Sequence, residues 1–101
     1  MSLNCQSINA KYNEFQILVE NINNISPLSV ICLQESWLDC NCDTSLFELP
    51  GYKLTNQGKT RCSDHGGLMI YVHEQFNVSK PLKIMDQITG WEYVCIEISH
   101  K

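Results

Sequence analysis

The sequence predicts an α/β protein with one mixed β-sheet and a flanking helix, and three observations lead to this prediction. Strand, helix and strand patterns follow one another within residues 2–33, which is the order of a βαβ unit. A strong alternating strand pattern follows at residues 68–72. The 101 residues, of which 44% are hydrophobic and 18% charged, suffice for one hydrophobic core but not for two. We therefore expect one domain, or part of one.

The first strand and the helix differ in the period of their apolar residues. Residues 2–8 alternate in polarity and predict a short strand. Residues 9–24 predict an amphipathic helix that Asn9 could cap and that Ser26-Pro27 ends. The apolar residues recur at spacings of three, four and three and are expected to face the core: Phe15, Leu18, Ile22 and Ile25.

The second strand is predicted at residues 30–33, a compact apolar run that indicates burial on both faces. Because a helix connects the two strands, they are expected to be parallel neighbours. Functional residues of such sheets gather beyond the carboxyl ends of the strands, and Glu35 lies at that end of the second strand. Glu35 is therefore a candidate site residue by position.

The remaining elements are predicted from breaks and alternation. We expect a short helical turn up to Leu49, a break at Pro50-Gly51, an edge strand at residues 52–55 and a loop at residues 56–65. The strand at residues 68–72 places Met69 and Tyr71 on one face. A loop to Pro81 and a last strand at residues 91–98 complete the prediction.

The charge and the cysteines narrow the functional classes. The net charge is −4, and residues 1–50 contain one lysine and six carboxylates, so the composition does not indicate a basic surface that binds nucleic-acid phosphates. No basic segment followed by an apolar run begins the sequence, and no apolar run approaches the ~20 residues of a membrane span. We expect an intracellular protein, nuclear or cytoplasmic and not secreted, without membrane contact and with reduced cysteines.

Two loops carry residue types that bind zinc. Cys40-x-Cys42 and Cys62-x-x-His65 could supply four ligands, although the first spacing is tighter than that of common zinc knuckles. A disulfide between Cys40 and Cys62 is the alternative in an oxidising setting. The plainest interpretation is that these are ordinary loop residues with neither role.

Four segments in this order resemble the endonuclease/exonuclease/phosphatase family, most closely the apurinic-endonuclease-like endonuclease of non-LTR retrotransposons. The segments are residues 3–7 (LNCQS), 31–38 (ICLQESWL), 51–52 (GY) and 66–72 (GGLMIYV), followed by a strand after Trp91. The resemblance covers nearly all of the chain. It implies a DNase I-like four-layer α/β sandwich, of which residues 1–101 would form the N-terminal part.

The resemblance also implies hydrolysis of phosphodiester bonds in DNA with Mg²⁺, or alternatively Mn²⁺. Asn4 and Glu35 stand at the family's metal-binding positions, where Glu35 would supply an anionic oxygen and Asn4 a neutral one that also orients phosphate. Both are therefore the predicted catalytic and metal-binding residues. Without the resemblance, each would be interpreted as an ordinary polar residue at a strand end.

The later motifs of the family have no counterpart in this sequence. Ser63-Asp64-His65 has the same residue types as the terminal Asp-His motif of the family. It stands directly before residues 66–72, which resemble an early element of the family, so we do not assign it that role. We expect a truncated nuclease domain that lacks its C-terminal half and is inactive alone. The alternatives are a non-catalytic binding module with the same half-fold, which the acidic balance favours, and a phosphoesterase that acts on small phosphoesters.

Overall fold

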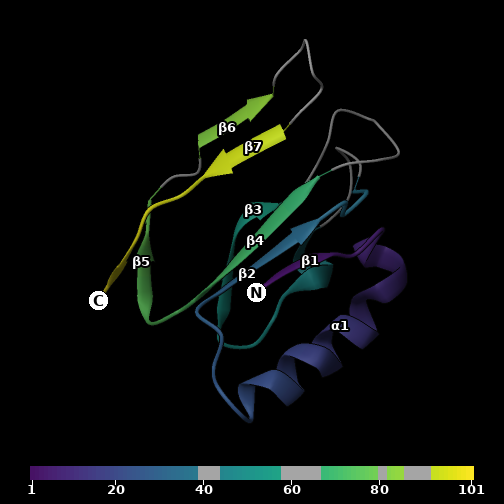
Figure 1. Ribbon diagram of the computed structural model, residues 1–101, viewed down its shortest axis with the longest axis horizontal. Coiled ribbons are helices and arrows are strands. Elements are labelled where there is room, and N and C mark those ends of the chain that lie inside the picture. The colour runs from purple at the N-terminus through teal and green to yellow at the C-terminus, as the bar shows by residue number, and fades with distance from the viewer. Residues whose placement is uncertain (39–43, 58–66, 80–81, 86–91) are drawn as a thin grey trace.

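The protein is described by a computed structural model that covers residues 1–38, 44–57, 67–79, 82–85 and 92–101. Along the chain (Figure 1), the elements are β1 (Ser2–Asn4), α1 (Ile8–Asn23), β2 (Val30–Gln34), the 3-10 helix η1 (Thr44–Phe47), β3 (Tyr52–Gln57), β4 (Leu68–His73), β5 (Phe76–Val78), β6 (Leu82–Met85), β7 (Glu92–Cys95) and β8 (Ile98–His100).

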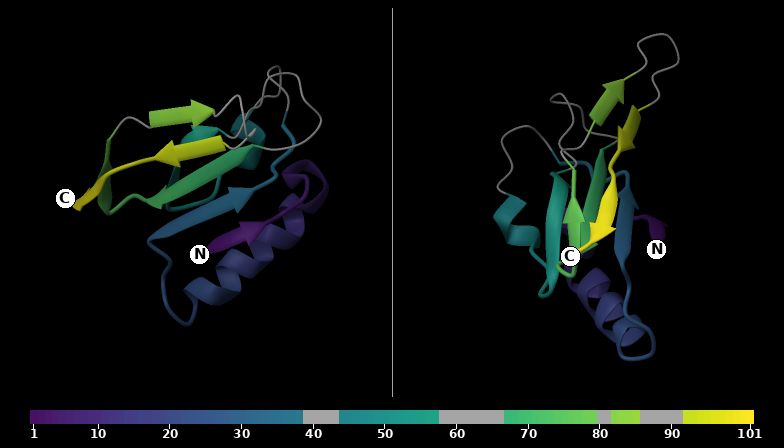
Figure 2. Two further views of the ribbon diagram at one scale, coloured as in Figure 1. Left: turned by 45° about the horizontal axis from the view of Figure 1, so that its top comes forward. Right: turned by 90° about the vertical axis from the view of Figure 1, so that its left-hand side faces the viewer.

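The main sheet has four strands in the order β1-β2-β4-β3. Strands β1 and β2 are parallel, with Asn4 opposite Gln34, whereas β4 runs antiparallel to both β2 and β3. Helix α1 connects the parallel pair and lies along the sheet (Figure 2). The predicted class is thus confirmed: the chain is a small α/β protein with a mixed sheet and one α-helix among the described residues.

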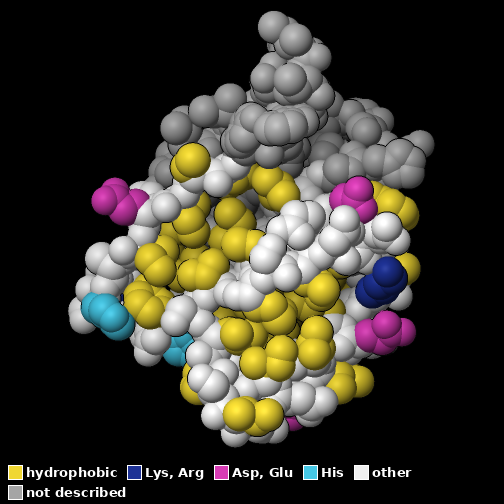
Figure 3. All heavy atoms as spheres, in the orientation of Figure 1, with side chains coloured by type: hydrophobic (Ala, Val, Ile, Leu, Met, Phe, Trp, Pro, Cys, Tyr) yellow, Lys and Arg dark blue, Asp and Glu magenta, His cyan; other side chains and the backbone are white. Residues whose placement is uncertain are grey.

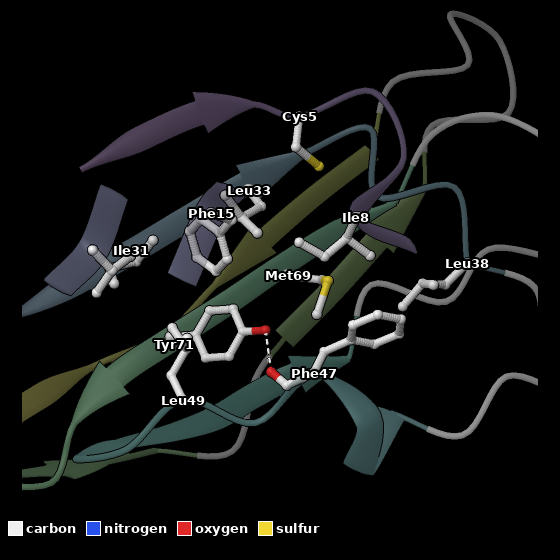
Figure 4. Packing of buried hydrophobic residues seen from close by; sticks show 11 residues of the cluster. Cys5, Ile8, Phe15, Ile31, Leu33, Leu38, Phe47, Leu49, Met69 and Tyr71 are labelled. Carbon is white, nitrogen blue, oxygen red and sulfur yellow. Dashed lines mark hydrogen bonds between the residues drawn. The ribbon is translucent and has the colours of Figure 1, made fainter. Parts of the chain in front are cut away.

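The hydrophobic core lies between α1 and one face of the sheet (Figure 4). Met69 and Tyr71 lie on this face, as predicted, and they pair with Leu33 and Ile31 of the neighbouring strand. These four residues are fully buried because the pleat sends alternate side chains to the same face. The Tyr71 hydroxyl donates a hydrogen bond of 2.6 Å to the Phe47 carbonyl, which ties η1 to the sheet.

The predicted burial of the second strand on both faces is wrong. Along β2 the burial alternates, and Val30, Cys32 and Gln34 are only half-buried on the face away from α1. The opposing residues of β4 differ, since Ile70 and Val72 are buried on that same face. The continuous apolar run of residues 30–33 therefore reflects one fully buried face and one partly covered face.

Helix α1 begins at Ile8, after an N-cap at Ser7 rather than at Asn9. Its buried residues are Ile8, Phe15 and Val19, spaced by seven and four, which is one helical face. The prediction that Leu18 and Ile25 belong to the core is wrong, since they are 39% and 89% exposed. Leu18 and Val19 are adjacent and both apolar, so the sequence pattern fitted two different helical faces equally well. Ile25 lies beyond the end of the helix.

The C-terminal part departs most from the predicted elements. The loop expected before Pro81 contains β5, β6 was not predicted, and the single strand expected at residues 91–98 is replaced by β7 and β8. Strand β7 pairs with β6, and β8 pairs with β5. Alternation of polarity continues across the join, so the sequence pattern cannot reveal that the strand partner changes. Strand β3 also extends two residues further than predicted, to Gln57.

None of the helices within the described ranges is both long and apolar enough to span a membrane.

Candidate functional site

The carboxyl ends of the two parallel strands form the candidate site. Strand β1 ends at Asn4 and β2 at Gln34, and the two segments that follow these strands stay hydrogen-bonded to each other. The amide of Cys5 donates to the Gln34 carbonyl at 3.0 Å, and the amide of Ser7 donates to the Glu35 carbonyl at 2.8 Å. The segments that carry Asn4 and Glu35 are therefore direct neighbours, as the βαβ pattern predicted.

Backbone strain is concentrated at this end of the sheet. All four non-glycine residues with positive φ in the described chain lie here: Gln6 (45°), Ser7 (82°), Glu35 (54°) and Trp37 (56°). Gly67, also with positive φ, accepts a hydrogen bond of 3.2 Å from the Ser36 amide through its carbonyl. Such conformations cost about 1–3 kcal/mol each and persist where the surroundings impose them, most often at functional sites. The strain marks this region independently of the family resemblance.

Asn4 projects from the face of the sheet away from α1. Its strand neighbour Leu3 pairs with the buried Leu33 on the helix face, so Asn4 and its partner Gln34 share the other face. Asn4 is exposed, which leaves its amide accessible to a ligand. The Gln34 amide donates to the Ser2 hydroxyl within this polar row.

Glu35 is half-buried and is the first residue after β2. Its φ of 54° breaks the strand, so the alternation that would send Gln34 and Glu35 to opposite faces does not continue through it. Gln34, for which no role was predicted, lies on the same face as Asn4 and is a neighbour of the candidate site.

Cys5, for which no role was predicted, directly follows Asn4 and contacts the segment that carries Glu35. Its thiol is 4% exposed and contacts the carbonyls of Gln34 at 3.4 Å and Glu35 at 3.6 Å. Burial raises the pKa of the Cys5 thiol, and the Glu35 charge raises it further. Cys5 is therefore a neutral packing residue that supports the two strand ends from the core side.

Ser36 is a second residue that the sequence left without a role. It is completely buried, and its carbonyl accepts a 3.0 Å hydrogen bond from the amide of Ile8, the first residue of α1. The strand end is thus joined to the start of the helix. A polar residue directly after a predicted strand was the available signal, but it did not distinguish a buried serine from an exposed one.

The donor set at this end is small. In the part of the chain that the structure describes, no group of three or more His, Cys, Asp or Glu residues could hold a metal ion. Asn4 and Glu35 bring one amide oxygen and two carboxylate oxygens to adjacent strand ends. These are hard donors of the kind that Mg²⁺ accepts, but they leave most of its roughly six positions to water or other ligands.

The predicted zinc ligands, the alternative disulfide and the Asp-His spelling lie outside the described residues. They comprise Cys40, Cys42, Cys62, Ser63, Asp64 and His65. The cysteines that are described, Cys5, Cys32 and Cys95, are free thiols.

No protein-family model matches this chain, and no curated protein matches it.

Proposed function

We propose that this chain supplies the N-terminal part of a Mg²⁺-dependent phosphodiester hydrolase domain, of the retrotransposon DNA endonuclease type, and is inactive alone. The observation that carries the proposal is the pairing of the Asn4 and Glu35 segments at the carboxyl ends of two parallel strands. This is the edge of an α/β sheet at which ligand sites form. Polar residue type, strand position and local strain coincide there.

The two side chains fit part of a magnesium site. Glu35 would bind the ion through its carboxylate and Asn4 through its amide oxygen, and water would complete the coordination. When bound, the metal would supply Lewis-acid stabilisation of charge on the phosphate and the leaving oxygen. Mn²⁺ has the same preference for oxygen donors and would serve as a substitute.

The residues around the site hold it in place. The hydrogen bonds from the Cys5, Ser7 and Ile8 amides fix the two segments relative to each other, so Asn4 and Glu35 are held at adjacent strand ends. Asn4 can also donate its amide hydrogens to a phosphate oxygen. The matched motifs contain no general base, so activation of water would depend on residues that the missing half supplies.

The partial four-layer sandwich is part of the same proposal. It requires a second layer against the face of the main sheet away from α1. Val30, Cys32 and Leu68 are half-buried on that face. Figure 3, in which the side of α1 is in view as well as the sheet, shows hydrophobic side chains in the middle of the described surface and charged side chains at its margin. An apolar sheet face of this kind is suited to packing against another layer.

The metal site can be tested with Mn²⁺ as a paramagnetic probe in ¹⁵N amide spectra of the full chain. We expect broadening of the signals of residues 4–8 and 34–37, with a dissociation constant on the order of millimolar because the donors are few. Glu35→Gln should remove the broadening, and Glu14→Gln on the exposed side of α1 should leave it unchanged. Broadening that survives Glu35→Gln, or that centres on other carboxylates, would contradict the proposal.

Activity is tested separately by nicking of supercoiled plasmid with Mg²⁺. The chain alone should give no turnover, because the motifs that match the family include no general base and only two metal ligands. Turnover that Glu35→Ala abolishes would show that the chain is a complete nuclease and would overturn the predicted inactivity.

A non-catalytic binding module is the second candidate, and the net charge of −4 favours it because DNA enzymes usually present a basic track. This module would keep the fold without binding a metal at Glu35. Absence of Mn²⁺ broadening at residues 4–8 and 34–37 would therefore select this candidate. A hydrolase for small phosphoesters would retain the broadening, and release of phosphate from a small phosphoester by the completed domain would identify it.

A further inference from the structure

A groove of about 680 Å³ lies between α1 and the turn that precedes β3, and neither Asn4 nor Glu35 lines it. Val19 and Leu49 are buried at its base, whereas Ile17 is 59% exposed on its wall. Pro50 lines the opposite side. The groove thus offers an apolar track that no described segment covers.

The rim of the groove is polar, and its charge is negative. Glu20 is the one charged residue among the described residues that line it, and Asn13 and Asn24 bring exposed amides. Gln16 and Asn23 also line the groove. The Gln16 amide donates a hydrogen bond to the Tyr12 hydroxyl, and the Asn23 amide oxygen accepts one from the Leu28 amide. The rim therefore combines amides that are held by hydrogen bonds within the chain with exposed amides that a ligand can reach.

The end of the groove near Glu20 favours a cation. Asn23 is the last residue of α1 and Asn24 is its C-cap, so the negative end of the helix dipole adds to the charge of the Glu20 carboxylate. A basic side chain commonly balances this charge, but the last turn of α1 holds none. Residues 1–38 and 44–57 together contain four glutamates and two lysines, so this part of the described chain is also negative on balance.

We propose that this groove docks a partner protein through an arginine-bearing segment. The aliphatic stem of arginine can lie along Ile17 and Pro50, while the guanidinium reaches Glu20 and the amide oxygens of Asn13 or Asn24. Arginine presents five donors in a fixed plane, which suits a carboxylate flanked by amide oxygens. The apolar track and the acidic end therefore select the same side chain.

The probe is the peptide acetyl-Ala-Leu-Arg-Leu-Ala-amide, titrated into the ¹⁵N-labelled full chain. Its control is the same peptide with citrulline, which keeps the shape of arginine without its charge. We expect saturable shifts at Asn13, Ile17, Glu20 and Asn24. The citrulline peptide should bind about tenfold more weakly, which is the loss expected for one charge-assisted hydrogen bond.

Two matched variants decide the assignment. Glu20→Gln should erase the preference for arginine over citrulline, whereas Glu14→Gln, an exposed carboxylate on the same helix outside the groove, should preserve it. Equal binding of both peptides, or shifts spread over α1 without saturation, would overturn the proposal. So would an oligonucleotide that occupies the groove, or self-association of the chain that Glu20→Gln abolishes, because each would identify a different occupant.

Discussion

The part of the molecule up to His73 and the part that follows it differ in how their strands are held. The first part packs α1 against the four-stranded sheet, and every buried hydrophobic residue of the described chain belongs to it. After His73, the described side chains are half-buried or exposed, and β8 is exposed throughout. The second part is joined by backbone pairing of β5 with β8 and of β6 with β7.

This difference indicates where the folding free energy comes from. Burial of apolar side chains is the dominant favourable contribution, and isolated two-stranded pairs are marginal in water. The first part should therefore fold as the stable unit, and the candidate site at the ends of β1 and β2 lies within it. The second part has a few specific contacts, such as the Phe76 and His100 rings with centroids 4.8 Å apart.

The largest expected effect is that of truncating the core of the first part. Leu33→Ala should lower the free energy of unfolding by about 2–5 kcal/mol, because Leu33 is fully buried between the sheet and α1. Ile98→Ala in β8 should cost less than about 1 kcal/mol, because Ile98 is 38% exposed. Urea denaturation measures both. Similar losses for the two variants would show that the second part is as tightly packed as the first.

Helix α1 offers the same contrast between adjacent residues. Val19→Ala should cost about 2 kcal/mol, because two buried methyl groups are lost from the core face. Leu18→Ala should cost less than about 0.5 kcal/mol, because Leu18 lies on the exposed side and alanine favours helix. Thermal and urea unfolding check the pair. A larger cost at Leu18 would mean that this side of α1 is covered in the folded chain.

Removal of a single hydroxyl tests how the cost of losing a hydrogen bond depends on burial, and the hydrogen bond from Tyr71 to Phe47 is the buried case. Tyr71→Phe should cost about 1–2 kcal/mol, because the Phe47 carbonyl loses its donor and Tyr71 is buried. Tyr52→Phe should cost less, since the Tyr52 hydroxyl that donates to the Leu28 carbonyl is only partly buried. Equal losses of unfolding free energy in the two variants would show that the difference in burial between the two hydroxyls does not matter.

The sequence predicted those features that follow from a repeating pattern. Alternation identified β4 and the face shared by Met69 and Tyr71, and the strand-helix-strand order predicted the parallel pairing of β1 with β2. The pattern was ambiguous in α1, where Leu18 and Val19 fit equally good helical faces. It was uninformative between β7 and β8, where the pairing partner changes while the polarity still alternates.

The candidate site was predictable in position but not in conformation. Glu35 was selected because it follows a buried strand, and its neighbour across the parallel pair followed from the topology. The positive φ values of Gln6, Ser7 and Glu35 have no sequence signal, because none of these residues is glycine, the residue type that favours such a conformation. The metal-binding roles of Asn4 and Glu35 stay predictions.

Relief of this strain is the next smaller effect and is specific to the site end of the first part. Ser7→Gly should stabilise the chain by about 1 kcal/mol, because glycine adopts a φ of 82° without steric cost. The gain is not offset by a lost cap, since the Ser7 side chain makes no capping hydrogen bond to α1. Ser7→Ala is the control and should give no gain. Destabilisation by Ser7→Gly would mean that the hydroxyl has a structural role.

The smallest effect compares a thiol of each part, the buried Cys5 and the exposed Cys95. The unfolded chain releases the Cys5 proton near the ordinary pKa of 9.0, whereas burial keeps it bound to higher pH in the folded chain. The unfolded state then binds fewer protons, so stability that is complete below pH 9 should fall as the pH rises above it, by at most about 1.4 kcal/mol per pH unit for this group.

Urea unfolding at pH 8 and pH 10 measures this slope, and Cys5→Ala should reduce it whereas Cys95→Ala should leave it unchanged. Burial also raises the pKa of Tyr71, and Cys5 contributes to that rise, so the change of slope in Cys5→Ala includes the effect of Cys5 on Tyr71. A thiol reagent gives an independent check, because Cys95 should react in the folded chain and Cys5 only as fast as the chain opens. Rapid modification of Cys5 under native conditions would show that the strand ends around Glu35 open without unfolding of the core, and that the candidate site is less rigid than its hydrogen bonds indicate.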